Sequence, residues 1–128
     1  MFKLNSSHFN MGIVQENKGA LDAAMESYKL AIKIKPGYAE AHLSLSFAFL
    51  NSGRLQEGLD EYEWRWKTAE KLSKKRHFSQ LLWDGITSLK DKTILLWGEQ
   101  GPGDMVIWSS CLSLMSCQAQ HCILECQE

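Results

Sequence analysis

Several features that mark other classes of protein are missing from this sequence. It has no run of the roughly 18 apolar residues that a membrane-spanning helix needs, and its first residues lack the apolar centre of a signal peptide. The formal net charge is only -1, which is the profile of neither a nucleic-acid-binding protein nor a disordered chain. We therefore expect a folded cytoplasmic protein whose partners include neither nucleic acid nor membrane.

Cysteine is also scarce outside one short stretch, and no two cysteines have the CxxC spacing typical of zinc sites. The four cysteines are Cys111, Cys117, Cys122 and Cys126. Free thiols in a reducing compartment are favoured over a metal centre for these residues. The composition thus predicts no metal and no other cofactor.

What the sequence does contain is an internal repeat. A shift of 34 residues places His8 on His42, Met11 on Leu45, Asn17 on Asn51, Gly19 on Gly53, Leu21 on Leu55 and Tyr28 on Tyr62. The first copy has small residues, one aromatic residue and a final proline at regular intervals, namely Gly12, Gly19, Ala20, Ala24, Tyr28, Ala31 and Pro36. This period is typical of helix pairs that stack on their neighbours. Residues 5–38 therefore resemble a tetratricopeptide repeat, and residues 39–72 resemble a second, more degenerate copy.

Apolar periodicity and turn residues predict two helices in each copy. We expect helices at residues 7–17, 20–34, 39–51 and about 55–72. Gly19 and Gly53 suit the left-handed conformation that ends the first helix of each copy, and Pro36 ends the second helix of copy one. The predicted fold is mainly α, an α-solenoid of helix-turn-helix repeats over residues 1–73.

The rest of the sequence predicts a connector and then a short βαβ segment. Residues 74–91 form the connector, and the basic stretch at 71–77 is interpreted as a solvated helix end rather than a nucleic-acid site. The expected elements after it are a strand at 93–97, a helix at 105–117 and a strand at 121–125. Their order indicates a partial βαβ unit of Rossmann-like type at residues 92–128.

The turn after the first predicted strand is rich in glycine. Backbone N–H groups at Gly101 and Gly103, next to a helix start, are placed to bind an anion. The turn matches neither the GxGxxG pattern nor a P-loop, so a sharp change of chain direction explains these glycines equally well. The next residue, Asp104, is interpreted either as a helix cap or as a catalytic carboxylate.

The sequence from Gly53 to Glu125 also resembles bacterial proteins in which tetratricopeptide repeats lead into a heptosyltransferase-like glycosyltransferase domain. The matching pieces are Gly53-Arg54-Leu55, Gly58, Tyr62-Glu63-Trp64-Arg65-Trp66, Trp83-Asp84-Gly85, residues 92–97, Glu99-Gln100-Gly101 and Gly103-Asp104. The resemblance implies a fold of two Rossmann-like lobes and makes Asp104 the candidate general base. Pro102 and the stretch 107–110 depart from the family pattern, which usually has an arginine in that stretch.

Length decides what the resemblance implies for activity. Residues 92–128 suffice for one βαβ unit, whereas a two-lobed enzyme binds its sugar nucleotide with a second lobe. We therefore interpret the chain as a truncated fragment that is not itself an enzyme. Transfer of a sugar from a nucleotide donor is the alternative function, and it would belong to the full-length form.

The first expectation for function is a protein–protein interaction module. The repeat resemblance places the binding groove on the first helix of each copy, at Phe9, Ile13, Glu16, Asn17, Leu43, Phe47, Leu50 and Asn51. This set has no lysine or arginine to bind a peptide carboxylate, so it suits an apolar peptide or helix, or the protein's own C-terminal segment. His8 and His42 share a repeat position and are expected to pack rather than to bind metal. Unpaired strand edges in the βαβ segment predict a homodimer.

Overall fold

The computed structural model describes residues 2–69, 78–98, 106 and 109–125. The chain divides into two compact units, residues 1–77 and residues 78–128. Each unit has its own secondary structure and is described by itself.

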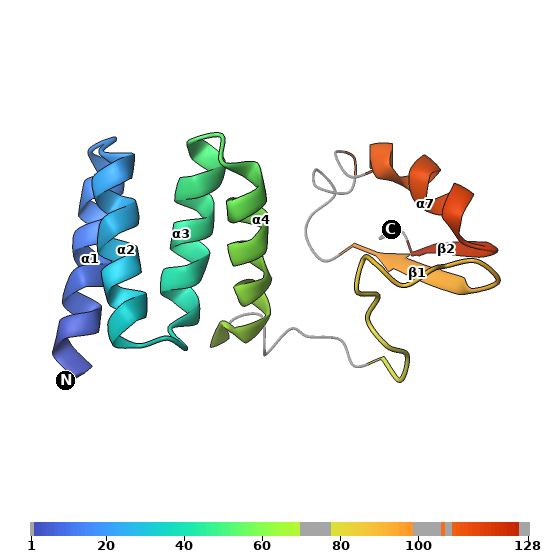
Figure 1. The fold of residues 1–128 in the computed structure, drawn as a ribbon, viewed down its shortest axis with the longest axis horizontal. Coiled ribbons are helices and arrows are strands. Elements are labelled where there is room, and N and C mark those ends of the chain that lie inside the picture. Colours follow the sequence, from blue (N-terminus) through green and yellow to red (C-terminus); the bar gives the residue numbers. More distant parts are fainter. Residues whose placement is uncertain (1, 70–77, 99–105, 107–108, 126–128) are drawn as a thin grey trace. The chain divides into compact units, whose positions relative to one another are not determined.

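The first unit is a row of helices joined at alternate ends (Figure 1). Its elements are α1 (Phe2–Asn17), α2 (Leu21–Ile34), α3 (Ala39–Asn51), α4 (Leu55–Tyr62) and the 3-10 helix η1 (Glu63–Lys67). The four helices predicted from the 34-residue period are confirmed, although α1 already begins at Phe2. Neighbours in sequence are neighbours in space, as expected for stacked helix pairs.

The two turns within the repeats depend on glycine. Gly19 has a φ of +76° and Gly53 a φ of +80°, a region that other residues rarely adopt. The Gly19 N–H donates to the Glu16 carbonyl at 2.8 Å, and the Gly53 N–H donates to the Leu50 carbonyl at 3.0 Å. Both copies therefore turn with the same local geometry.

The fourth helix of the first unit is interrupted earlier than the sequence predicts, although Ala69 is helical again. The α-helix ends at Tyr62, the chain tightens into η1, and Thr68 is extended, with a φ of -72° and a ψ of 148°. Copy two has bulky residues here, with Trp64 and Arg65 where copy one has Leu30 and Ala31, so the close helix contact of copy one cannot be repeated. The end of the predicted helix, at 70–72, lies outside the described residues, as does the basic stretch at 71–77.

The core of the first unit lies where α2 packs on α3. Its buried cluster consists of Ala24, Met25, Tyr28, Leu45, Ala48 and Phe49, with Phe9 and Ile32 packed against it. Tyr28 is completely buried, and Gly12 on α1 leaves room for its ring. The small and aromatic positions of the repeat pattern thus form the core.

The second unit contains two parallel strands with helical turns between them. Strand β1 (Thr93–Trp97) pairs with β2 (His121–Glu125) in a register that joins Thr93 to His121 and Trp97 to Glu125, and η2 (Ser109–Cys111) and α7 (Leu112–Gln118) lie between them in the chain (Figure 1). Both predicted strands are found at their predicted bounds. Among the described residues Val106 is already helical, next to the predicted start at 105, and α7 ends at Gln118, one residue after the predicted end at 117.

The Trp83-Asp84-Gly85 segment before β1 is held by a compact set of hydrogen bonds. Asp84 Oδ1 accepts from the N–H groups of Ile86 and Thr87 at 2.9 and 2.7 Å, and Asp84 Oδ2 accepts from Thr87 Oγ1 at 2.6 Å. These bonds lower the pKa of Asp84 to about 2, and the bond from the Thr87 hydroxyl has the largest effect. Trp83 Nε1 donates to the Thr87 carbonyl at 2.8 Å, so the side chains of this segment fix the loop before β1.

Candidate protein-binding surface

The contact between α1 and α2 fixes the first repeat around one aromatic side chain. Tyr28 of α2 packs against the Gly12 backbone of α1, and its hydroxyl donates to Glu16 Oε2 at 2.6 Å. Burial, together with the neighbouring Glu16 carboxylate, raises the pKa of Tyr28 well above its usual value. The adjacent bond from Ser27 Oγ to Gln15 Oε1, at 2.6 Å, ties the same two helices together.

The predicted groove presents apolar side chains at two recurring repeat positions. Ile13 on α1 and Phe47 on α3 occupy equivalent places in the two copies, and both are exposed. Phe9 and Leu43, also equivalent, are half-buried beside them. The Phe9 ring lies 5.8 Å from the ring of Tyr28 and 5.1 Å from that of Tyr38, so Phe9 contributes both to the core and to the surface.

The other predicted groove residues have varied surroundings. Asn17 and Asn51 are exposed at the ends of α1 and α3. Glu16 accepts the hydrogen bond from Tyr28, and Leu50 covers Gly58, where an added Cβ would lie 2.7 Å from the Leu50 side chain. The apolar part of the surface is therefore supplied chiefly by Ile13, Leu43 and Phe47.

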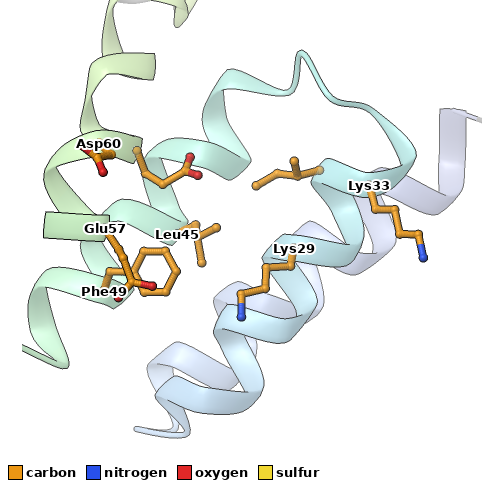
Figure 2. A pocket seen from close by; sticks show the side chains of 8 residues that line it. Lys29, Lys33, Leu45, Phe49, Glu57 and Asp60 are labelled. Atoms are coloured by element: carbon orange, nitrogen blue, oxygen red, sulfur yellow. The ribbon is translucent and has the colours of Figure 1, made fainter. Parts of the chain in front are cut away.

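A pocket of about 440 Å³ lies where α2, α3 and α4 meet (Figure 2). Its wall on α2 is basic, its wall on α4 is acidic and its apolar residues include two from α3; the lining residues are Lys29, Lys33, Ile32, Leu45, Phe49, Glu57, Asp60 and Glu61. The sequence analysis did not identify this pocket. The sequence gives only an indirect indication of the pocket's charged walls. Lys29 and Lys33, four residues apart, lie on one face of α2, and Glu57 and Glu61, also four residues apart, lie on one face of α4.

Several charges around the pocket are already paired within the chain. Arg54 donates to Glu57 from Nε at 2.6 Å, which lowers the pKa of Glu57, and its guanidinium lies 4.4 Å from the centre of the Phe49 ring. Lys29 Nζ donates to Glu26 Oε1 at 2.7 Å. Both ion pairs join residues three apart at the same helix, and the Arg54–Phe49 contact is the one in this set that connects α4 with α3.

His42 joins three elements of the second repeat. Its Nδ1 lies 2.5 Å from Glu61 Oε2, and its Nε2 lies 2.9 Å from the Pro36 carbonyl oxygen. The ring is stacked on Trp64, with centroids 3.8 Å apart and an interplanar angle of 1°. The packing role predicted for His42 is confirmed, and it attaches α4 and η1 to α3.

The predicted sites of the C-terminal segment are only partly within the described residues. Asp104, Gly101, Gly103 and Cys126 lie outside them. Cys111 and Cys117 are exposed free thiols, and Cys122 is a half-buried free thiol. Across residues 2–69, 78–98, 106 and 109–125, no group of three or more metal-ligating side chains comes together. No helix in this part of the chain is long and apolar enough to cross a membrane.

Part of the helical unit is similar to a known class of repeat. Residues 17–53 match the tetratricopeptide repeat family, and this stretch runs from the end of α1 through α2 and α3 to the turn at Gly53. The match confirms the repeat predicted from the 34-residue period. Residues 17–53 of the first unit therefore have the character of a tetratricopeptide repeat scaffold.

Two solved structures of MamA are similar to part of this chain. One is 28% identical with a TM-score of 0.48, and the alignment covers 56% of this chain and 42% of that MamA chain. The other is 27% identical with a TM-score of 0.47 and covers 61% of this chain and 41% of that MamA chain. This chain thus spans less than half of the MamA chains that it matches, and no curated protein matches it.

Proposed function

We propose that the helical unit is a protein-binding scaffold that holds an apolar segment of a partner protein against Ile13, Leu43 and Phe47. The observation that carries this proposal is the exposure of large apolar side chains at equivalent positions on α1 and α3. Isolated apolar residues are normal on a surface, but apolar residues repeated on the first helix of both copies can act together as one strip. Asn17 and Asn51 lie at the ends of the same two helices, and their amides can bond the backbone of a bound segment.

The charge of this strip narrows the class of partner. None of the eight predicted groove residues is a lysine or arginine, so a ligand held by its terminal carboxylate would find no cation among them. A partner helix with one apolar face matches the strip better, because its side chains at spacings of three and four residues can meet Ile13 and Phe47 in turn. We therefore infer an amphipathic helix as the bound segment.

A displayed library of amphipathic 15-residue peptides would test this function. Selected peptides should carry apolar residues at helical spacing, and Phe47→Asp should weaken their binding by about tenfold or more, since a buried unpaired carboxylate is costly. The matched control is Leu30→Asp, an equally exposed apolar position on α2 outside the strip. Peptides that bind Phe47→Asp as tightly as the unchanged chain would contradict the proposal, and loss on Lys33→Glu instead would assign binding to the pocket between α2, α3 and α4.

The parallel pairing of β1 and β2 favours a second candidate function. A parallel pair with a helix in the connection is the opening of a βαβ sheet, and such sheets are normally covered on both faces. We propose that residues 92–128 correspond to the start of a glycosyltransferase-like lobe. In that lobe Gly101 and Gly103 would offer N–H groups to an anion, and Asp104 would act as the general base.

Donor turnover distinguishes this second candidate from the first. We expect the 128-residue chain to hydrolyse or transfer no sugar from a panel of nucleotide sugars, because one strand pair does not supply the two lobes that hold a donor. Product release from each donor is the measurement. Turnover that disappears in Asp104→Asn would replace the scaffold interpretation with an enzymatic one.

Self-association through the second unit is also part of the proposed function. Leu95 and Ile123 are register partners on β1 and β2, and both are exposed. Each strand of a two-stranded sheet also has one edge without a partner strand in that sheet. We infer a homodimer in which the strands of two chains pair or their open sheet faces pack.

A further inference from the structure

Helices α1 and α4, the first and the fourth of the row, carry apolar side chains that the described residues leave exposed. The α1 face consists of Leu4, Met11 and Val14, and the α4 face consists of Leu55 and Leu59. Helices α1 and α4 lie at opposite ends of the row (Figure 1). Because the row is a repeat, each of these faces has an equivalent inside the molecule, where its burial can be compared.

On the α1 side, the equivalent residues are buried against α2. Met11 corresponds to Leu45 and Val14 to Ala48. Met11 is 53% exposed and Leu45 only 3%, while Val14 is 47% exposed and Ala48 is completely buried. Helix α1 thus exposes the face that is equivalent to the face of α3 packed against α2.

On the α4 side, the equivalent residues are less exposed. Leu59 corresponds to Met25, and the exposed fractions are 49% and 3%. Leu55 corresponds to Leu21; Leu55 is 62% exposed, whereas Leu21 is half-buried. Helix α4 thus exposes the face that is equivalent to the face of α2 packed against α3.

The two exposed faces match each other in size as well as in place. Inside the chain, Met25 of α2 and Leu45 of α3 share the buried cluster. Between chains, Leu59 of α4 would meet Met11 of α1. This is again a leucine–methionine contact, but here the second helix of a repeat supplies the leucine and the first helix supplies the methionine. Leucine and methionine replace each other in cores at small cost because their volumes are similar.

The charges beside the two faces are also of opposite sign. Arg54, in the turn before α4, interacts with the charges of Asp22 and Glu26 on α2. The turn before α2 carries Lys18, two residues before the position equivalent to Arg54, and the residue equivalent to Glu26 is Asp60 on α4. A cation in the turn of one chain would therefore meet a carboxylate on the end helix of another.

We propose that the α1 face of one chain packs on the α4 face of a second copy, and so repeats the α2–α3 contact between molecules. Such a contact joins two different surfaces, so it generates an open series of chains or a ring instead of a closed pair. The inference rests on the helical repeat alone. It is separate from the peptide strip and from strand pairing in the second unit.

Two variants of the 128-residue chain, each with one face blocked, would test the proposal. Sedimentation velocity over a range of concentrations is the measurement. The unchanged chain should form a series of assemblies that grows with concentration. Met11→Lys and Leu59→Glu should each stop this growth, with the dissociation constant raised by about tenfold or more, because each buries an unpaired charge. Mixing the two variants should restore larger assemblies, because each still has the face that the other needs.

Matched variants make every outcome decisive. Leu30→Lys, at an exposed apolar position of α2 outside both faces, should assemble as the unchanged chain does, and circular dichroism should show the same helix content in all variants. Ile123→Lys alone tests strand pairing and should remove only the dimer formed by the second unit. Three results would each overturn end-to-end packing. These are an unchanged chain that forms no assembly larger than that dimer, Met11→Lys and Leu59→Glu variants that form assemblies as large as those of the unchanged chain, and a mixture of the two variants that forms no larger assemblies than either variant alone.

Discussion

Replacing Tyr28 by alanine is expected to lower the free energy of unfolding by about 3 to 5 kcal/mol, the usual range for removing a large buried aromatic side chain. Tyr28 is completely buried, contacts both α1 and the α2–α3 cluster, and donates a hydrogen bond to Glu16. Its loss leaves a cavity at the point where three helices meet. Chemical denaturation followed by far-ultraviolet circular dichroism measures the change.

Two further substitutions separate the causes. Tyr28→Phe removes only the hydroxyl and its bond to Glu16, so we expect a loss of about 1 kcal/mol. Tyr62→Ala changes the equivalent residue of copy two, which is half-buried, and should also have a smaller effect than Tyr28→Ala. A change below about 1 kcal/mol for Tyr28→Ala would show that the ring does not hold the repeat together.

Replacing Gly12 by alanine should destabilise the chain, although this change normally stabilises a helix. A helical glycine is about 1 kcal/mol less favourable than alanine. At this position, however, the added Cβ would lie 2.4 Å from Cε1 and 2.6 Å from Cδ1 of Tyr28, and the buried ring has no space into which to move. Forcing the two helices apart costs about 1 to 3 kcal/mol, so we expect a net loss of stability.

The same denaturation measurement on two other variants identifies the clash as the reason. Gly37→Ala should be neutral or stabilising, since no atom lies within 4 Å of its added Cβ and its φ is not positive. In a Tyr28→Ala background, Gly12→Ala should lose its destabilising effect, because the methyl group then has room. Equal effects of Gly12→Ala with and without the Tyr28 ring would argue against direct packing of these two residues.

The sequence predicted the helical unit well because its signals are local and occur twice. Each signal defines a feature within one helix pair. Glycine marks the turn in each copy, proline marks the end of α2, and apolar residues at helical spacing mark the helices themselves. The equivalence of Gly19 and Gly53 also predicted that both copies turn alike, which the two φ values confirm. The strands at 93–97 and 121–125 were predicted because their apolar runs are short and bounded by turn residues.

Features that depend on three elements at once could not be predicted from the sequence. The pocket between Lys33 and Asp60 exists only because α2, α3 and α4 converge, and no single helix shows it. Where α4 ends, His42 of α3 contacts Glu61 of α4 and Trp64 of η1, a set of contacts between residues far apart in the chain. The roles of Asp104, Gly101 and Gly103, as well as the homodimer, stay predictions.

The two units differ in how far apart in the chain their contacting residues lie, which has a consequence for the order of folding. In the first unit each helix contacts the next one through a short turn, so little chain entropy is lost before a contact forms. The pairing of Thr93 with His121 instead requires the whole connection to close before the first strand contact is made. Domains with local contacts fold faster, so the helical row should be complete while β1 and β2 are still separate. During that interval the strands of neighbouring chains compete with the native partner, and newly made protein at high concentration should aggregate through its second unit.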